Sequence, residues 1–183
     1  MNDVNNKVGR QAIQLRRITC TAYKRDDGRW DVEGVLVDTD PCGMVHPERG
    51  SIGPEDPIHE MHVRLTIDSE FVIHEAEAIT IHSPYGVCSG ANAAYAQLVG
   101  IQIGAGFVTT VRRLFQRASG CTHITELLPA MATTAFQAFF RRAAAIPEDG
   151  SMPSPIDACH ALRSDGEVVK KYFPRHYRTP RND

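Results

Sequence analysis

Three side chains that can bind a metal ion stand where structural elements are expected to begin. His59 precedes a strand-like segment, and Cys88 and Cys121 each begin a helix-like segment. A helix N-terminus favours the thiolate form of cysteine, and zinc and ferrous iron prefer mixtures of sulfur and imidazole ligands. The sequence therefore predicts that these three residues bind one Zn²⁺ or Fe²⁺ ion.

The sequence leaves the identity of the fourth ligand open, because several further side chains could bind the same ion. They are His123, Glu60, His82, Asp38 and the pair Cys159–His160. A side chain next to a ligand can reach an open coordination position, so Glu60 or His123 is predicted as the general base. A metal-free alternative has Cys88 or Cys121 as nucleophile, with His123 or His59 as its base.

Two hairpins are predicted to position these groups. Residues 17–24 and 30–38 alternate apolar and polar side chains around an Asp-Gly turn, and residues 61–67 and 71–82 form a second such pair. Consecutive hairpins favour an antiparallel meander. Between them, residues 40–57 are rich in Pro and Gly, which predicts a long surface loop.

Helical periodicity follows the last strand. The predicted helices run from Cys88 to a stop at Gly100, over Phe107–Arg117, and from near Cys121 to Ala145. Smaller predicted elements are a short helix near Gln11–Leu15, a helical turn at Asp157–Arg163 and a strand at Glu167–Phe173. The expected fold is therefore α+β, with an antiparallel sheet of about four strands in two hairpins and three main helices on one face.

Length and composition predict one globular domain. We expect it over residues 17–174, between a flexible lead-in (1–16) and a loose tail (175–183). A net charge of −2 without a basic stripe gives no sign of nucleic acid, and no apolar run reaches the ~20 residues of a membrane span. The polar N-terminus lacks the apolar region of a signal peptide, so a cytoplasmic protein with reduced cysteines is expected.

Several motifs resemble an uncharacterised bacterial family. They are Tyr23-x-Arg25-Asp26-Asp27-Gly28-x-Trp30-Asp31-x-Glu33-Gly34, Pro57-Ile58-His59-Glu60-Met61, Gly120-Cys121-Thr122-His123-Ile124-Thr125-Glu126-Leu127 and Cys159-His160-Ala161. Between Arg17 and Pro174 the chain resembles domain-of-unknown-function family 2889. This resemblance implies no established activity.

The middle of the chain also resembles, more distantly, the iron–sulfur scaffold proteins NifU, IscU and SufU. Asp56-Pro57-Ile58-His59-Glu60-Met61 runs into a strand, Cys88 begins an alanine-rich segment and Cys121 begins a later helix, as the three scaffold cysteines do. The resemblance implies a NifU/SufE-like core with His59, Cys88 and Cys121 at the scaffold's ligand positions. His59 replaces a cysteine, and because such clusters are usually held by four thiolates, the set is closer to catalytic zinc.

Together these observations predict a metal-binding cytoplasmic protein that acts as a metal-dependent enzyme, a hydrolase or lyase, on a small organic substrate. An iron–sulfur or sulfur-transfer scaffold that carries a cluster is one alternative, and a structural-zinc binding module is another. The sequence predicts no nucleic-acid or membrane partner, and it leaves open whether the chain forms a homo-oligomer.

Overall fold

The computed structural model describes residues 8–140 and 155–180. Contacts divide the chain into two compact units, Met1–Ala135 and Phe136–Asp183, and each is described by itself. The single domain predicted over residues 17–174 includes parts of both units. The predicted end of the third helix at Ala145 and residues 1–7 of the predicted lead-in lie outside the described residues.

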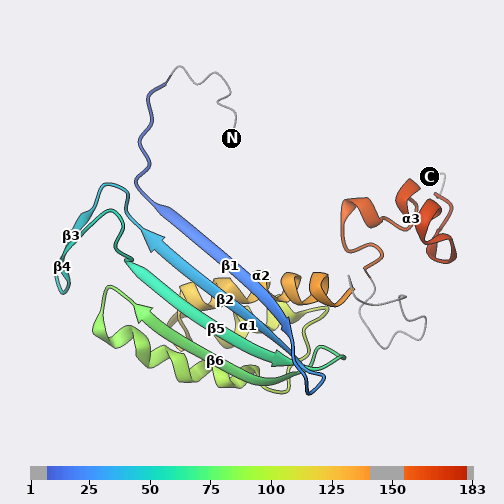
Figure 1. Ribbon diagram of the computed structural model, residues 1–183, viewed down its shortest axis with the longest axis horizontal. Coiled ribbons are helices and arrows are strands. Elements are labelled where there is room, and N and C mark those ends of the chain that lie inside the picture. Colours follow the sequence, from blue (N-terminus) through green and yellow to red (C-terminus); the bar gives the residue numbers. More distant parts are fainter. Residues whose placement is uncertain (1–7, 141–154, 181–183) are drawn as a thin grey trace. The chain divides into compact units, whose positions relative to one another are not determined.

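A four-stranded antiparallel sheet with the order β1-β2-β5-β6 is the centre of the first unit (Figure 1). Its strands are β1 (Leu15–Lys24), β2 (Trp30–Thr39), β5 (His59–Ile67) and β6 (Ile73–His82). Both predicted hairpins and the meander are confirmed. The short helix predicted near Gln11–Leu15 is wrong, because Leu15 already pairs with Thr39 at the start of β1.

A small second sheet interrupts the segment that was predicted to be a loop. β3 (Met44–His46) and β4 (Gly50–Ile52) form a two-stranded hairpin, so the loop prediction for residues 40–57 is wrong at its centre. Gly50 turns the chain with a φ of 70°. Strands of three residues are too short to show an alternating pattern, although His46 and Ile52 are buried.

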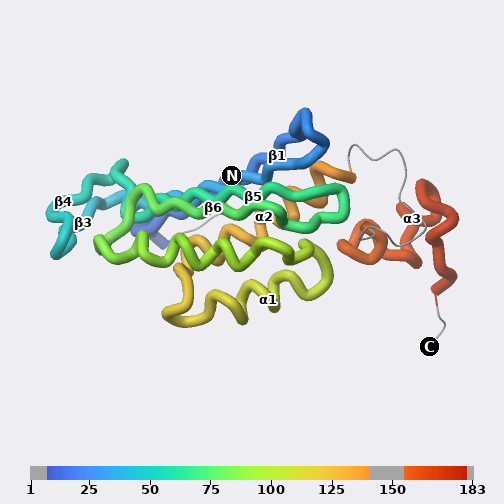
Figure 2. Tube along the Cα trace, turned by 90° about the horizontal axis from the view of Figure 1, so that it is seen from below, coloured from blue at the N-terminus to red at the C-terminus, as the bar shows by residue number. Residues whose placement is uncertain are grey.

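Three helices follow the sheet, and all three lie on the same side of it (Figure 2). They are the 3₁₀ helix η1 (Gly86–Leu98), α1 (Phe107–Leu114) and α2 (Thr122–Phe140). The second helix ends three residues before its predicted end, and Arg117–Ser119 forms a separate turn, η2, that begins with a φ of 54° at Arg117. Each helix stands near its predicted position, and the α+β fold is confirmed.

The core forms between the sheet and the helices. On β2, the side chains of Trp30, Val32 and Leu36 are buried, whereas the residues between them are partly exposed, as the predicted alternation requires. Gly34 stands in the same row, and a Cβ atom there would lie 2.6 Å from Met131 Sδ of α2. The glycine therefore permits α2 to pack closely on β2. Further fully buried members are Leu65, Ile67, Phe71, Ile73, Tyr95, Leu98, Ile103, Ile124, Leu127 and Leu128.

The second unit contains the short helices η3 (His160–Leu162), α3 (Glu167–Tyr172) and η4 (Pro174–His176). The strand predicted at Glu167–Phe173 is wrong, because this segment forms α3. Extended Gly166 precedes the helix, Glu167 lies in its first turn, and two lysines lie in its last turn, where they complement the helix dipole. These end effects and the burial of Val169 outweigh the strand preference of adjacent valines.

None of the described helices combines the length and the apolar character that crossing a lipid bilayer requires.

Candidate metal centre

The core-facing rows of three strands end in polar side chains at one end of the sheet. Asp38 follows Leu36 in the buried row of β2, and it pairs directly with His59 on β5 and with Arg16 on β1. Residues two apart in a strand point to the same face. Arg16, Asp38 and His59 therefore lie side by side on the helix-covered face, where β2 ends and β5 begins (Figure 1).

Asp38 is the buried anion of this group, with a side chain only 1% exposed. Arg16 Nε donates to its Oδ1 over 2.7 Å, and a second guanidinium nitrogen donates to its Oδ2 over 2.8 Å. Burial raises the pKa of the Asp38 carboxyl, but the hydrogen bonds and charge of Arg16 outweigh it and leave the pKa below its ordinary value. Asp38 is therefore ionised at neutral pH.

Two histidines meet at the same carboxylate oxygen. His59 Nδ1 lies 3.3 Å and His123 Nε2 lies 3.4 Å from Asp38 Oδ2, and the two imidazole rings stack with centroids 3.7 Å apart. His123 is the second residue of α2, so packing of this helix on the sheet places it over His59.

Both imidazoles are held neutral. Burial, reinforced by the neighbouring His123, lowers the pKa of His59 to about 4. Burial also lowers the pKa of His123, against the opposing charge of Asp38. Nδ1 of His59 is buried, and its 3.3 Å contact with Asp38 Oδ2 does not have the geometry of a hydrogen bond. Neutral imidazole is the form that binds metal ions, and an unsatisfied buried nitrogen costs about 1–3 kcal/mol.

One ligand atom from each of Asp38, His59 and His123 lies within 4.8 Å of the other two. Among the residues that the structure describes, this is the one group of His, Cys, Asp or Glu that meets this condition. Two imidazole nitrogens with one carboxylate oxygen form a donor set that suits zinc or ferrous iron.

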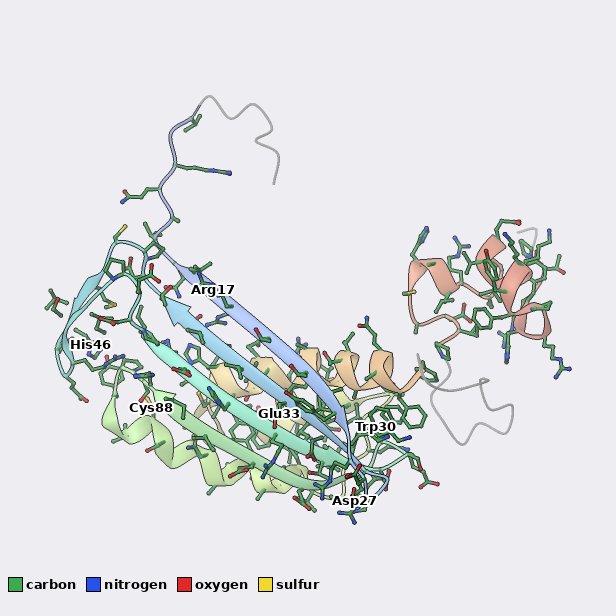
Figure 3. The ribbon with its side chains drawn as sticks, in the orientation of Figure 1. Arg17, Asp27, Trp30, Glu33, His46 and Cys88 are labelled. Carbon is green, nitrogen blue, oxygen red and sulfur yellow. The ribbon has the colours of Figure 1, made fainter. Side chains whose placement is uncertain are left out.

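Of the two cysteines in the predicted ligand set, Cys121 contacts this group and Cys88 is not part of it. Cys121 immediately precedes α2, and its Sγ lies 3.8 Å from Nδ1 of His123, the ring nitrogen that faces away from Asp38. Cys88 lies in the first turn of η1. It stands at the β3–β4 end of the unit, where His46 of β3 also lies (Figure 3). Cys88 is not part of the three-residue group.

Glu60, one of the two predicted general bases, faces the opposite side of the sheet from its neighbour His59. Its carboxylate oxygens contact His62 Nε2 at 3.0 Å and His82 Nδ1 at 2.9 Å. Glu60 and His82 thus form a separate cluster on the face that the helices leave open. Cys159 and His160 belong to the other compact unit.

Sequence reasoning missed Arg16 altogether, gave Asp38 only as a candidate fourth ligand, and gave His123 as a candidate fourth ligand or general base. The signal for Asp38 was its register, because it continues the apolar row of Trp30, Val32 and Leu36, and a charged residue in a core-facing row needs a partner. Arg16 occupies the matching position on β1.

This fold and site define an α+β protein with a buried aspartate and two partly buried histidines grouped beneath the end of an antiparallel sheet. The family described as "Protein of unknown function (DUF2889)" matches residues 14–137, which is more than half of the 183-residue chain. The chain belongs to this family, as its motifs predicted. The matched segment contains the whole group, Arg16 and Cys121 included.

Comparison with curated proteins and with solved structures found no match to the chain. The predicted resemblance to the iron–sulfur scaffold proteins therefore has no support from these comparisons.

Proposed function

We propose that this protein binds one divalent transition-metal ion, Zn²⁺ or Fe²⁺, through Asp38, His59 and His123, and that it is a metal-dependent enzyme for a small organic substrate. The observation that carries the proposal is the convergence of two neutral imidazoles and a buried carboxylate from β2, β5 and α2. The buried Nδ1 of His59, which makes no hydrogen bond, supports it, because a metal bond would satisfy this atom.

A purely structural ion pair explains the group less well. Histidines that served only to neutralise Asp38 would have raised pKa values, because protonation strengthens such a pair. Here burial lowers the pKa of both histidines, and Arg16 already supplies the cation for Asp38. Two stacked neutral rings beside a paired carboxylate are better suited to accept a metal ion.

The number of protein ligands bears on the enzymatic role. Three ligands would leave an open position, where a bound metal acts as a Lewis acid on water or a substrate carbonyl. The proposal keeps His59 from the sequence prediction and treats Cys121 as the acceptor that orients His123. If a fourth protein ligand closed the set, the structural-zinc alternative would gain support.

Arg16 is a positioning residue in this proposal. Its two hydrogen bonds fix the plane of the Asp38 carboxylate, and a carboxylate can accept further interactions beyond these two. Arg16 is 39% exposed while Asp38 is 1% exposed, so the guanidinium shields the group on its solvent side.

Elemental analysis of protein purified without chelator tests the metal proposal. We expect about one zinc or iron per chain in the wild type and less than about a tenth of that in His59→Ala, because removal of one of three ligands strongly weakens binding. His74→Ala is the matched control, since His74 is a histidine of the same sheet that instead pairs with Asp68. Its metal content should equal that of the wild type.

Circular dichroism and thermal unfolding should show that His59→Ala is folded. A wild-type protein that is purified without metal and then fails to bind added Zn²⁺ or Fe²⁺ would contradict the proposal.

One observation favours a second, metal-free candidate function. Cys121 Sγ, the His123 ring and the Asp38 carboxylate stand in the order thiol, imidazole, carboxylate, through contacts of 3.8 and 3.4 Å. A thiol nucleophile with a histidine base uses this order. Selective alkylation of Cys121 over Cys88 by iodoacetamide near neutral pH, together with inhibition by added zinc, would favour this candidate over the metal enzyme.

The iron–sulfur scaffold alternative is weaker. Within the part of the chain that the structure describes, the group of Asp38, His59 and His123 has a single cysteine in contact with it, Cys121, whereas cluster scaffolds rely mainly on thiolates.

A further inference from the structure

The phenol of Tyr95 joins η1 to the first turn of α2. Tyr95 Oη accepts a hydrogen bond from the backbone N–H of Cys121 over 2.9 Å. It lies 2.8 Å from both the Cys121 carbonyl oxygen and Thr125 Oγ1, and it can donate its one proton to either of them. The two residues that it contacts stand on either side of His123 in the sequence.

Tyr95 is itself held rigidly. Its side chain is fully buried, and its ring stacks on that of Phe115 with a centroid distance of 4.3 Å. The chain approaches it closely at Gly120, where a Cβ atom would lie 3.0 Å from Tyr95 Oη and 2.7 Å from Phe115 Cβ. Glycine at this position lets the segment before α2 reach the phenol.

These contacts satisfy groups that a helix start otherwise leaves free. The first N–H groups of a helix have no partner within it, and a side chain normally caps them. Here a tyrosine from another helix binds the N–H of Cys121, while the Cys121 carbonyl oxygen accepts the first α2 hydrogen bond from Thr125 N over 2.9 Å. The backbone of Cys121 before His123 and the side chain of Thr125 after it are therefore tied to one fixed oxygen atom.

We propose that Tyr95 is a positioning residue for the metal centre: by holding Cys121 and Thr125, it sets where His123 stands relative to Asp38 and His59. This inference rests on the proposed function. Metal–ligand distances tolerate deviations of only about 0.2 Å, and removal of a group that orients a ligand typically weakens metal binding about 10–100-fold. A side chain that touches no ligand directly thus controls affinity for a divalent transition metal.

The test is Tyr95→Phe, which keeps the ring and its stacking on Phe115 but removes the hydroxyl. Titration with Co²⁺ gives both the affinity and the ligand-field absorption spectrum of the bound ion. We expect binding about tenfold weaker or more, with a changed spectrum, because His123 is no longer held in place. Ile73→Val is the stability control, since Ile73 is fully buried and pairs with Ile67 at the opposite end of the sheet.

Ile73→Val should bind Co²⁺ with the wild-type spectrum and within about twofold of the wild-type affinity, even where its melting temperature falls as far as that of Tyr95→Phe. Thr125→Val serves as a second, milder variant that decides the question if Tyr95→Phe does not fold. It removes one of the three contacts, and we expect a smaller loss of affinity with the same direction of spectral change.

The outcomes test the positioning role of Tyr95 separately from the proposed metal binding on which it rests. If the wild type does not bind Co²⁺, the metal proposal fails. If the wild type binds and the folded Tyr95→Phe or Thr125→Val variants bind equally well with an unchanged spectrum, the metal proposal stands and the positioning role of Tyr95 is overturned.

Discussion

At His59, burial has a consequence for the stability of the metal-free protein. The pKa of His59 is about 4 in the folded state, against an ordinary value near 6.5 in the unfolded chain. Between these values the unfolded state binds a proton that the folded state excludes, so the free energy of unfolding falls as the pH falls. The lowered pKa of His123 acts in the same direction, whereas the contribution of Asp38 is lost only at more acidic pH.

We therefore predict that, with metal removed by chelator, the free energy of unfolding decreases by about 2 kcal/mol for His59 alone between pH 7 and pH 5. Urea denaturation at a series of pH values measures this change. His59→Gln should flatten the profile. A wild-type profile without slope between pH 7 and pH 5 would show that His59 is not held neutral by folding.

At the scale of elements, the contact between α2 and β2 decides where His123 lies. A Cβ atom at position 34 would stand 2.6 Å from Met131 Sδ and 2.8 Å from Met131 Cγ, and Met131 is fully buried. Gly34→Ala should therefore destabilise the protein by about 1–3 kcal/mol through overpacking, although alanine is otherwise the better residue in a strand.

Chemical denaturation of a double-mutant cycle measures the effect. In a Met131→Ala background the space is available, and Gly34→Ala should then cost less than about 0.5 kcal/mol. Equal costs in both backgrounds would mean that the α2–β2 contact does not depend on this glycine.

At the scale of the whole molecule, the fold and the site belong to the first compact unit. Nearly all of the buried apolar side chains that the structure describes lie in this unit, as do Asp38, His59 and His123, and the family match covers residues 14–137. A chain truncated after Phe140 should therefore melt within about 5 °C of the full-length protein, a shift of roughly 1 kcal/mol, and should bind as much of the proposed Zn²⁺ or Fe²⁺ as the full-length chain.

Thermal unfolding and elemental analysis of the truncated chain provide the measurement. A chain truncated after Ser119 lacks α2 and is the control, and it should lose both cooperative unfolding and metal. Loss of either property on truncation after Phe140 would show that the second unit is needed for the first.

The amino-acid sequence by itself determined the elements that depend on neighbouring residues. Alternation predicted both hairpins, helix-forming residue types predicted η1, and helical periodicity predicted α1 and α2, because each of these signals is set within a few residues. Short segments escaped this reasoning, as β3 and β4 did, and α3 was misassigned because two valines suggested a strand.

Which residues join His59 in the candidate metal centre depended on tertiary structure. His59 was recognised from its residue type, but its neighbours Asp38 and Arg16 follow from strand register, and His123 follows from the packing of α2 over the sheet. Cys88 was chosen from sequence because it begins a predicted helix, where the thiolate form of cysteine is favoured. Ligand type is a property of a residue, whereas convergence within bonding distance is a property of register and packing, which no local pattern contains.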